Sequence, residues 1–295
     1  MVLKTDYDPA KDIPDLASKV IVITGGTAGS GKQTILTLSK HAPSHLLFTG
    51  RNTKAANEVI DEAQALSPST IFSFIPCDHW PVFPHINSSR CERDTLQNRA
   101  HRRPNLQRRH HGRTTGLSKD GYEIQFAINF LAHALLIRIL LPALEETFAT
   151  EADARIVLLD LKTPQENLDL GSKWLRYAQS KLAMMLYAKL LAKRYPNFAS
   201  IAIHPGIALT GLVEDQLFGD RLWLKTATFG QNIPVQEGVY NACWAATARI
   251  GKDQRVAGGM FQPVGIRTRD TKFSSDEELA ERLWEWTEEQ LESYK

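Results

Sequence analysis

The sequence predicts a single α/β domain over residues 1–295, with a doubly wound, mainly parallel sheet and helices on both faces. Two observations support this. Short apolar, often β-branched runs alternate with longer helical segments along most of the chain. The first strand–helix unit also contains a glycine-rich turn, within the stretch VIVITGGTAGSGKQT at positions 20–34.

The glycine turn predicts a phosphate-binding site. Val20–Ile23 has the composition of a strand buried on both faces, and four glycines follow within residues 24–31. Such a turn aims backbone N–H groups and the positive end of a helix at a phosphate. Glycine allows the pyrophosphate to come close and the turn to adopt positive φ. One alternative is a P-loop at Gly26–Lys32, but Gln33 replaces the Mg²⁺-binding hydroxyl of that motif.

Composition is that of an ordinary globular protein. Hydrophobic residues make up 43% of the chain and charged residues 23%. Three scattered cysteines suit neither a disulfide framework nor a zinc site, so no metal is expected. The first residues are polar, and the run Phe130–Leu144 is interrupted by His133 and Arg138. We therefore expect a cytoplasmic protein without a membrane span.

The remaining elements follow in order. Strands are expected at 45–49, 70–76, 155–159, 200–203 and 258–265, and helices at 32–41, 54–66, 119–144, 177–192, 234–247 and 276–294. The strand at 45–49 ends at Gly50-Arg51. In dinucleotide folds an acid at the end of this strand binds the ribose of NAD. Gly50 removes that acid, and the Arg51 guanidinium suits the 2′-phosphate of NADP.

Residues 79–115 interrupt the pattern, with neither helical nor strand periodicity. Residues 79–118 hold eight arginines, no lysine and only two acids. Arg99–Thr115, read one base later with permitted codons, can become EHIDVLICNAGIMAVPP, an apolar strand; we interpret this part as a shifted reading frame. If the protein is made as written, the segment is expected to loop out and damage the sheet, because burying unpaired guanidinium groups is very unfavourable. A basic patch for nucleic acid is the alternative, but it lacks interleaved aromatic residues, so no nucleic-acid partner is expected.

Two later motifs are candidates for the chemistry of the site. Tyr177 and Lys181 are four residues apart, so they share one helix face. A tyrosine with an ordinary pKa near 10 is a poor acid–base group at neutral pH, and a nearby ammonium stabilises its phenolate. After the strand at 200–203 comes the turn His204-Pro205-Gly206, which ends at Thr210.

With these motifs, the chain resembles the short-chain dehydrogenase/reductase family over residues 18–78 and 116–292, closest to its retinol-dehydrogenase-like branch. The matching patterns are Thr24-Gly25-x-x-x-Gly29-x-Gly31, Tyr177-x-x-x-Lys181 and Pro205-Gly206-x-x-x-Thr210. The resemblance implies a Rossmann-type fold, bound NADP (NADPH), and interconversion of an alcohol with an aldehyde or ketone. It also allows a homodimer.

The resemblance implies roles for individual residues. Tyr177 would move the proton, Lys181 would lower the tyrosine pKa and hold the nicotinamide ribose, and Asn129 would hold a water of the proton relay. The implied cofactor contacts are Thr24, Gly25, Gly29, Ser30, Gly31, Lys32, Arg51, Asp78, Arg138, Tyr177, Lys181, Pro205, Gly206, Ile207 and Thr210.

The chain departs from the family at a second place. The family has a serine at the end of the fifth strand that binds the substrate oxygen, but this chain has Asp160-Leu161, and Thr163 is a weak substitute. Residues 211–233 match the family's substrate lid, and their aromatic residues favour a small apolar substrate. An NADP-dependent oxidoreductase is the leading prediction. A catalytically impaired nucleotide-binding remnant, or a misread gene product, is the alternative, and a P-loop NTPase is the weaker one.

Overall fold

The computed structural model describes residues 6–76, 83–86 (backbone), 117–118, 120–151, 153–159, 173–204, 234–248 and 257–292. Its sheet has the order β3-β2-β1-β4-β5-β6-β7-β8. The strands are β1 (Val20–Ile23), β2 (His45–Gly50), β3 (Ile71–Pro76), β4 (Phe83–Ile86), β5 (Arg155–Leu159), β6 (Ala199–Ile203), β7 (Met260–Gln262) and β8 (Ile266–Arg267). Adjacent strands from β3 to β1 and from β5 to β7 pair in parallel. The predicted α/β class and mainly parallel sheet are confirmed.

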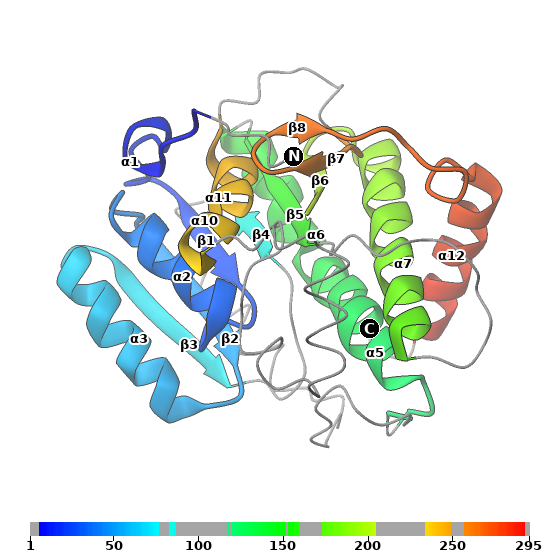
Figure 1. Ribbon diagram of the computed structural model, residues 1–295, viewed down its shortest axis with the longest axis horizontal. Coiled ribbons are helices and arrows are strands. Elements are labelled where there is room, and N and C mark those ends of the chain that lie inside the picture. The colour runs from blue at the N-terminus through cyan, green and yellow to red at the C-terminus, as the bar shows by residue number, and fades with distance from the viewer. Residues whose placement is uncertain are drawn as a thin grey trace.

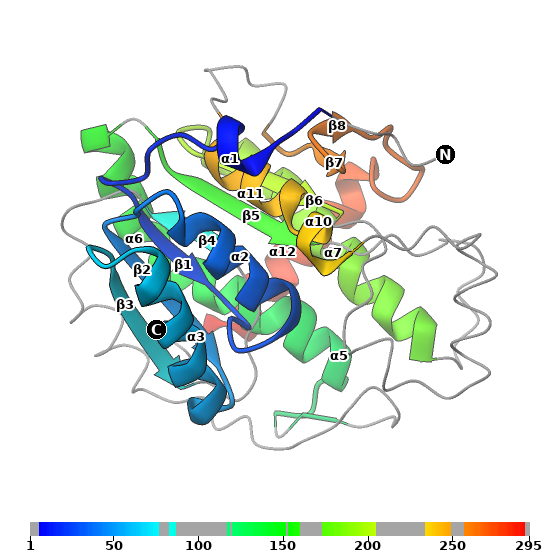
Figure 2. The ribbon, with the colours of Figure 1, turned by 60° about the vertical axis from the view of Figure 1, so that its left-hand side comes forward.

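Helices cover both faces of the sheet (Figures 1 and 2). One face carries α2 (Gly29–Ser39), α3 (Thr53–Leu66) and α11 (Tyr240–Thr247), with α1 (Pro9–Asp12) and α10 (Val235–Gly238) beside them. The other face carries α5 (Ile124–Phe126), the π-helix η1 (Ala127–Leu131), α6 (Ala132–Glu151) and α7 (Lys173–Arg194), and α12 (Glu277–Gln290) packs on α7.

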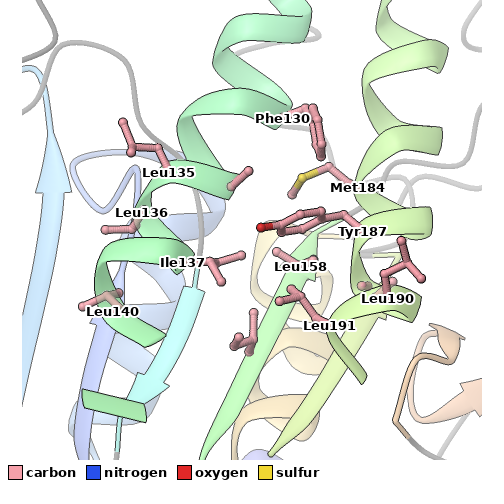
Figure 3. Close-up of a cluster of buried hydrophobic side chains, with 14 of the residues drawn as sticks. Phe130, Leu135, Leu136, Ile137, Leu140, Leu158, Met184, Tyr187, Leu190 and Leu191 are labelled. Carbon is pink, nitrogen blue, oxygen red and sulfur yellow. The ribbon is translucent and has the colours of Figure 1, made fainter. Parts of the chain in front are cut away.

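Alternation along β1 explains the two layers. Val20 and Val22 belong to the apolar cluster under α6 and α7, whereas Ile21 and Ile23 belong to the cluster under α2 and α3. A strand buried on both faces must be apolar at every position, and all four residues are buried. Figure 3 shows the larger cluster, in which Tyr187 of α7 lies among residues of η1, α6, α7 and β5.

Strand β4 corrects the expectation that residues 79–115 contain no strand. Its backbone lies between β1 and β5 and is antiparallel to both. A gap there would leave backbone N–H and C=O groups of β1 and β5 unpaired in the interior, which is unfavourable. The short stretch Phe83–Ile86 fills part of that gap.

Several helix boundaries differ from the sequence prediction. The helix expected at 119–144 begins at Ile124, because Glu123 caps it by accepting a hydrogen bond from the Phe126 N–H at 2.8 Å, and it continues to Glu151. The helix expected at 234–247 is two helices, α10 and α11, divided at Val239. Residues 124–150 are long and apolar enough to cross a membrane by length and composition, but 61% of their most apolar window is buried inside the protein. This burial is that of a core helix.

Candidate functional site

The glycine turn has the backbone geometry of a phosphate cradle. Gly25 and Gly29 adopt φ values of +64° and +54°, which favour glycine. A Cβ on Gly31 would collide with the Gly25 carbonyl oxygen and lie 2.8 Å from the Gly25 carbonyl carbon. The helix α2 begins at Gly29 without a side-chain cap from Ala28, so its first N–H groups are open to a ligand. Ser30 lies in this first turn, and its carbonyl oxygen accepts a hydrogen bond from the Thr34 hydroxyl at 2.8 Å.

Two buried hydroxyls flank the turn. Thr24 directly follows β1 and is 3% exposed, and Thr49 lies in β2 and is 5% exposed. Among the described residues, neither hydroxyl oxygen has a hydrogen-bond partner. A buried polar group without a partner is unfavourable, so both hydroxyls suit a site that is completed by a bound ligand.

Arg51 is exposed directly after β2. The next residue, Asn52, caps α3 by accepting a hydrogen bond from the Ala55 N–H at 3.1 Å, so the chain turns sharply away after Arg51. Gly50 is buried against Thr27 of the glycine turn, whereas Arg51 is exposed.

Lys32, a predicted cofactor contact, has an ionic partner within the protein. Its ammonium forms an ion pair with Glu62 Oε1 of α3 at 2.5 Å instead of facing the glycine turn. The Lys32 side chain therefore lies on the side of α2 that packs against α3. Its predicted contact with the cofactor stays a prediction.

Lys32→Ala should therefore leave nucleotide binding almost unchanged. We expect the NADPH dissociation constant to change by less than about 2-fold, and the free energy of unfolding to fall by less than about 1 kcal/mol, because the pair is partly exposed. Binding is measured by calorimetry and stability by denaturant unfolding. Glu62→Ala is the matched control and should show the same small loss of stability. A 100-fold loss of NADPH affinity in Lys32→Ala alone would show that Lys32 contacts the cofactor.

Tyr177, Lys181 and Asn129 lie in one connected group. The Lys181 ammonium lies 5.6 Å from the centre of the Tyr177 ring. The Asn129 amide donates a hydrogen bond to the Ser180 hydroxyl at 3.1 Å, and that hydroxyl donates to the Tyr177 carbonyl oxygen at 2.7 Å. Ser180 is fully buried. The structure thus brings the three predicted catalytic residues together, and Ser180 links their two helices.

Asn129 lies on the π-helical turn η1, which the sequence reasoning missed. A π-turn shifts side chains relative to a regular helix and is frequent at functional sites. Here it holds the Asn129 amide against Ser180 of α7. The sequence does contain one hint of this contact: Ser180, the partner of Asn129, lies between the two residues of the Tyr177–Lys181 motif.

His133 is a second residue that the sequence reasoning missed. It follows Asn129 by one helical turn and is 4% exposed. Burial lowers its pKa well below the ordinary value, and the positive charge of Lys181 lowers that pKa further. His133 is therefore neutral near pH 7.

Arg138, another predicted cofactor contact, pairs with the C-terminal helix. Its guanidinium pairs with the Glu288 carboxylate of α12 at 3.3 Å and donates to the Glu288 carbonyl oxygen at 3.4 Å. Arg138 lies more than two turns beyond Asn129, and its contact with the cofactor stays a prediction. Its observed role is to attach α12 to α6.

Several predicted residues lie outside the described residues. These are Asp78, Asp160, Thr163, Pro205, Gly206, Ile207, Thr210 and the lid at 211–233. Their roles stay predictions. In the part of the chain that the structure describes, no group of three or more His, Cys, Asp or Glu residues could hold a metal ion.

No family model matches the chain. The short-chain dehydrogenase/reductase drtF of Aspergillus calidoustus is 27% identical over 307 residues, covering 95% of each chain. The polyprenol dehydrogenase of Homo sapiens is 24% identical over 290 residues, covering 92% of this chain and 84% of the relative.

Solved structures show the same fold. An NADPH-bound short chain oxidoreductase from Pseudomonas aeruginosa superposes with a TM-score of 0.61 at 17% identity, covering 88% of this chain and 100% of that chain. The oxidoreductase yciK of E. coli gives a TM-score of 0.57 at 17% identity, covering 88% and 99%. The chain is therefore similar in sequence to short-chain dehydrogenase/reductases, and its fold is that of short-chain oxidoreductases of known structure.

Proposed function

We propose that this protein is an NADP-dependent oxidoreductase that interconverts an alcohol and a carbonyl group on a small, apolar substrate. The observation that carries the proposal is the group of Tyr177, Lys181 and Asn129, joined through Ser180. Relatives named as dehydrogenases support the reaction class. Structures of the same fold that contain NADPH or NADP support the cofactor.

The residues present fit a dinucleotide. Gly31 lets the first turn of α2 pack tightly against Gly25, because a side chain there would collide with the Gly25 carbonyl oxygen. Thr24 and Thr49 supply buried hydroxyls whose partners the described residues do not provide. When bound, the nicotinamide would donate a hydride to the carbonyl carbon of the substrate or accept one from the alcohol carbon.

The protein's own residues would move the matching proton. In the reduction, the Tyr177 phenol donates its proton to the substrate oxygen, and in the oxidation the phenolate takes it back. Lys181 stabilises the phenolate electrostatically, since its ammonium lies 5.6 Å from the ring centre. Asn129 is held on the same group by Ser180, where it would orient a water that returns the proton to Tyr177.

Arg51 is proposed to read the 2′-phosphate. Arg51→Ala should weaken NADPH binding roughly 10–100-fold, because a hydrogen bond between charged groups is worth about 1.5–3 kcal/mol, and should change NADH binding less than about 3-fold. Calorimetry with both nucleotides measures this. Lys54→Ala, at an exposed position in the first turn of α3, is the matched control. An equal loss for NADPH and NADH would contradict the assignment.

A catalytically impaired nucleotide-binding remnant is the second candidate. Asp160 stands where the family has its serine, and its charge would oppose the negative charge that develops on the substrate oxygen during reduction. The two candidates separate in an assay of NADPH oxidation with a panel of aldehydes and ketones. An enzyme consumes NADPH with at least one substrate, and a remnant binds it without turnover. A cytoplasmic location and a homodimer stay proposals of the same kind.

A further inference from the structure

Gly50 and Thr27 compete for one small volume. Gly50 ends β2 and is buried, and Thr27 lies in the glycine turn after β1. A Cβ built on Gly50 would meet every side-chain atom of Thr27: it would come nearest to Cγ2 and lie 2.8 Å from Oγ1 and 3.2 Å from Cβ. Contacts under 3 Å between such atoms do not occur in folded proteins, so the two side chains cannot both be present without a shift of the backbone.

Rotation of Thr27 does not relieve the conflict. The Thr27 Cβ has three staggered positions, and two of them now face Gly50, occupied by Cγ2 and Oγ1. Threonine has two heavy substituents on Cβ. In every rotamer at least one of them must therefore face Gly50.

The end of β2 is where nucleotide preference is decided in this architecture. A carboxylate at that place accepts hydrogen bonds from the ribose hydroxyls of NAD and repels a 2′-phosphate. The backbone of the turn is tied to the same place, because the Gly26 N–H donates to the Thr49 carbonyl oxygen at 2.8 Å. This hydrogen bond opposes a separation of β2 from the turn that would make room for a larger residue 50.

We propose that Thr27 is a specificity-determining residue, which confines residue 50 to glycine and so excludes a carboxylate from the ribose end of the cofactor site. This rests on the proposed NADP-binding function. Arg51 attracts the 2′-phosphate, whereas Thr27 removes the competing NAD-type arrangement. The preference for NADPH then has an attractive and an excluding component.

The packing is tested first without any change of charge. Gly50→Ala should lower the melting temperature by roughly 3–10 °C, because the added methyl group overpacks the contact with Thr27. In the Thr27→Ala background, adding Gly50→Ala should lower the melting temperature much less than it does in the parent protein. Equal losses in both backgrounds would overturn the proposal.

The nucleotide preference is tested with Gly50→Asp in three backgrounds. We measure the rise in melting temperature caused by NADPH and NADH for Gly50→Asp with Thr27, with Thr27→Ala, and with Thr27→Val. Valine keeps both positions on Cβ filled and is the matched control. We expect NADH to give the larger rise only in the Thr27→Ala background, with at least a 10-fold reversal of relative affinity, and no such gain with threonine or valine.

The outcomes separate the two proposals. If the parent protein responds to NADPH but Gly50→Asp prefers NADH regardless of residue 27, this inference is overturned and the proposed function stands. If the parent protein responds to neither nucleotide, the proposed function is overturned and this inference with it.

Discussion

Tyr177→Phe should lower kcat by about 100- to 10,000-fold, the range that a general acid–base group contributes. The change removes the hydroxyl that gives a proton to the substrate oxygen and keeps the ring near Lys181. NADPH binding should change only a few-fold, because most of the cofactor site is made by the glycine turn and Arg51. Both quantities are measured on the same preparation, by initial rates and by calorimetry.

Tyr187→Phe is the matched control for this prediction. Tyr187 lies on the same helix, is 1% exposed and stacks on Trp284 with ring centres 4.9 Å apart. Burial raises the pKa of this phenol, so it does not exchange protons near neutral pH. Removal of the Tyr187 hydroxyl should leave kcat within about 2-fold of the parent value. Full turnover in Tyr177→Phe would remove the proposed mechanism.

Gly31→Ala should disrupt both folding and nucleotide binding. The new methyl group would collide with the Gly25 carbonyl oxygen and lie 3.1 Å from the Gly26 Cα. All the atoms it meets belong to the backbone, so no side-chain rotation can relieve the overlap. Overpacking of this kind costs about 1–3 kcal/mol, and the displaced turn should weaken NADPH binding by at least about 10-fold.

Gly121→Ala is the control for Gly31→Ala. Gly121 has φ of +85° and open space where a Cβ would be, so this change introduces only backbone strain, of about 1 kcal/mol. NADPH affinity should be unchanged in it. The denaturant midpoint and the NADPH dissociation constant distinguish the two variants. Parental NADPH affinity in Gly31→Ala would show that the glycine turn is not the phosphate cradle.

Local patterns were sufficient for most of the fold. The run at 20–23, the glycine turn and the strand at 155–159 were predicted at the residues where the structure has them, because each pattern depends on neighbours in the sequence. The grouping of Tyr177, Lys181 and Asn129 also followed from helix periodicity and the family motifs.

Long-range contacts explain what the sequence analysis did not predict. Lys32 and Arg138 are cations whose partners, Glu62 and Glu288, lie far away in the sequence, and only the packing of α3 and α12 reveals them. The restriction on Gly50 is of the same kind, because it depends on the turn after β1 lying over the end of β2. No local pattern carries such information.

Strand β4 marks the part of the chain that the sequence explains least. It has four residues, runs antiparallel to both neighbours and contains Pro84, which has no N–H group to donate to the ladder. Arg99–Thr115 lies outside the described residues. The shifted-frame interpretation therefore stays a prediction, and sequencing the transcript across residues 79–115 decides it.

The most direct test of the NADP site is a thermal-shift titration of the unmodified chain with NADPH, NADH and MgATP in parallel. A ligand that binds only the native state raises the melting temperature. At 100 times its dissociation constant it stabilises the folded state by about 2.7 kcal/mol. We expect NADPH at that concentration to raise the melting temperature by roughly 5–10 °C, with a smaller rise for NADH and none for MgATP. The absence of a cooperative transition, or a rise with MgATP and none with NADPH, would contradict the NADP site proposed for this chain.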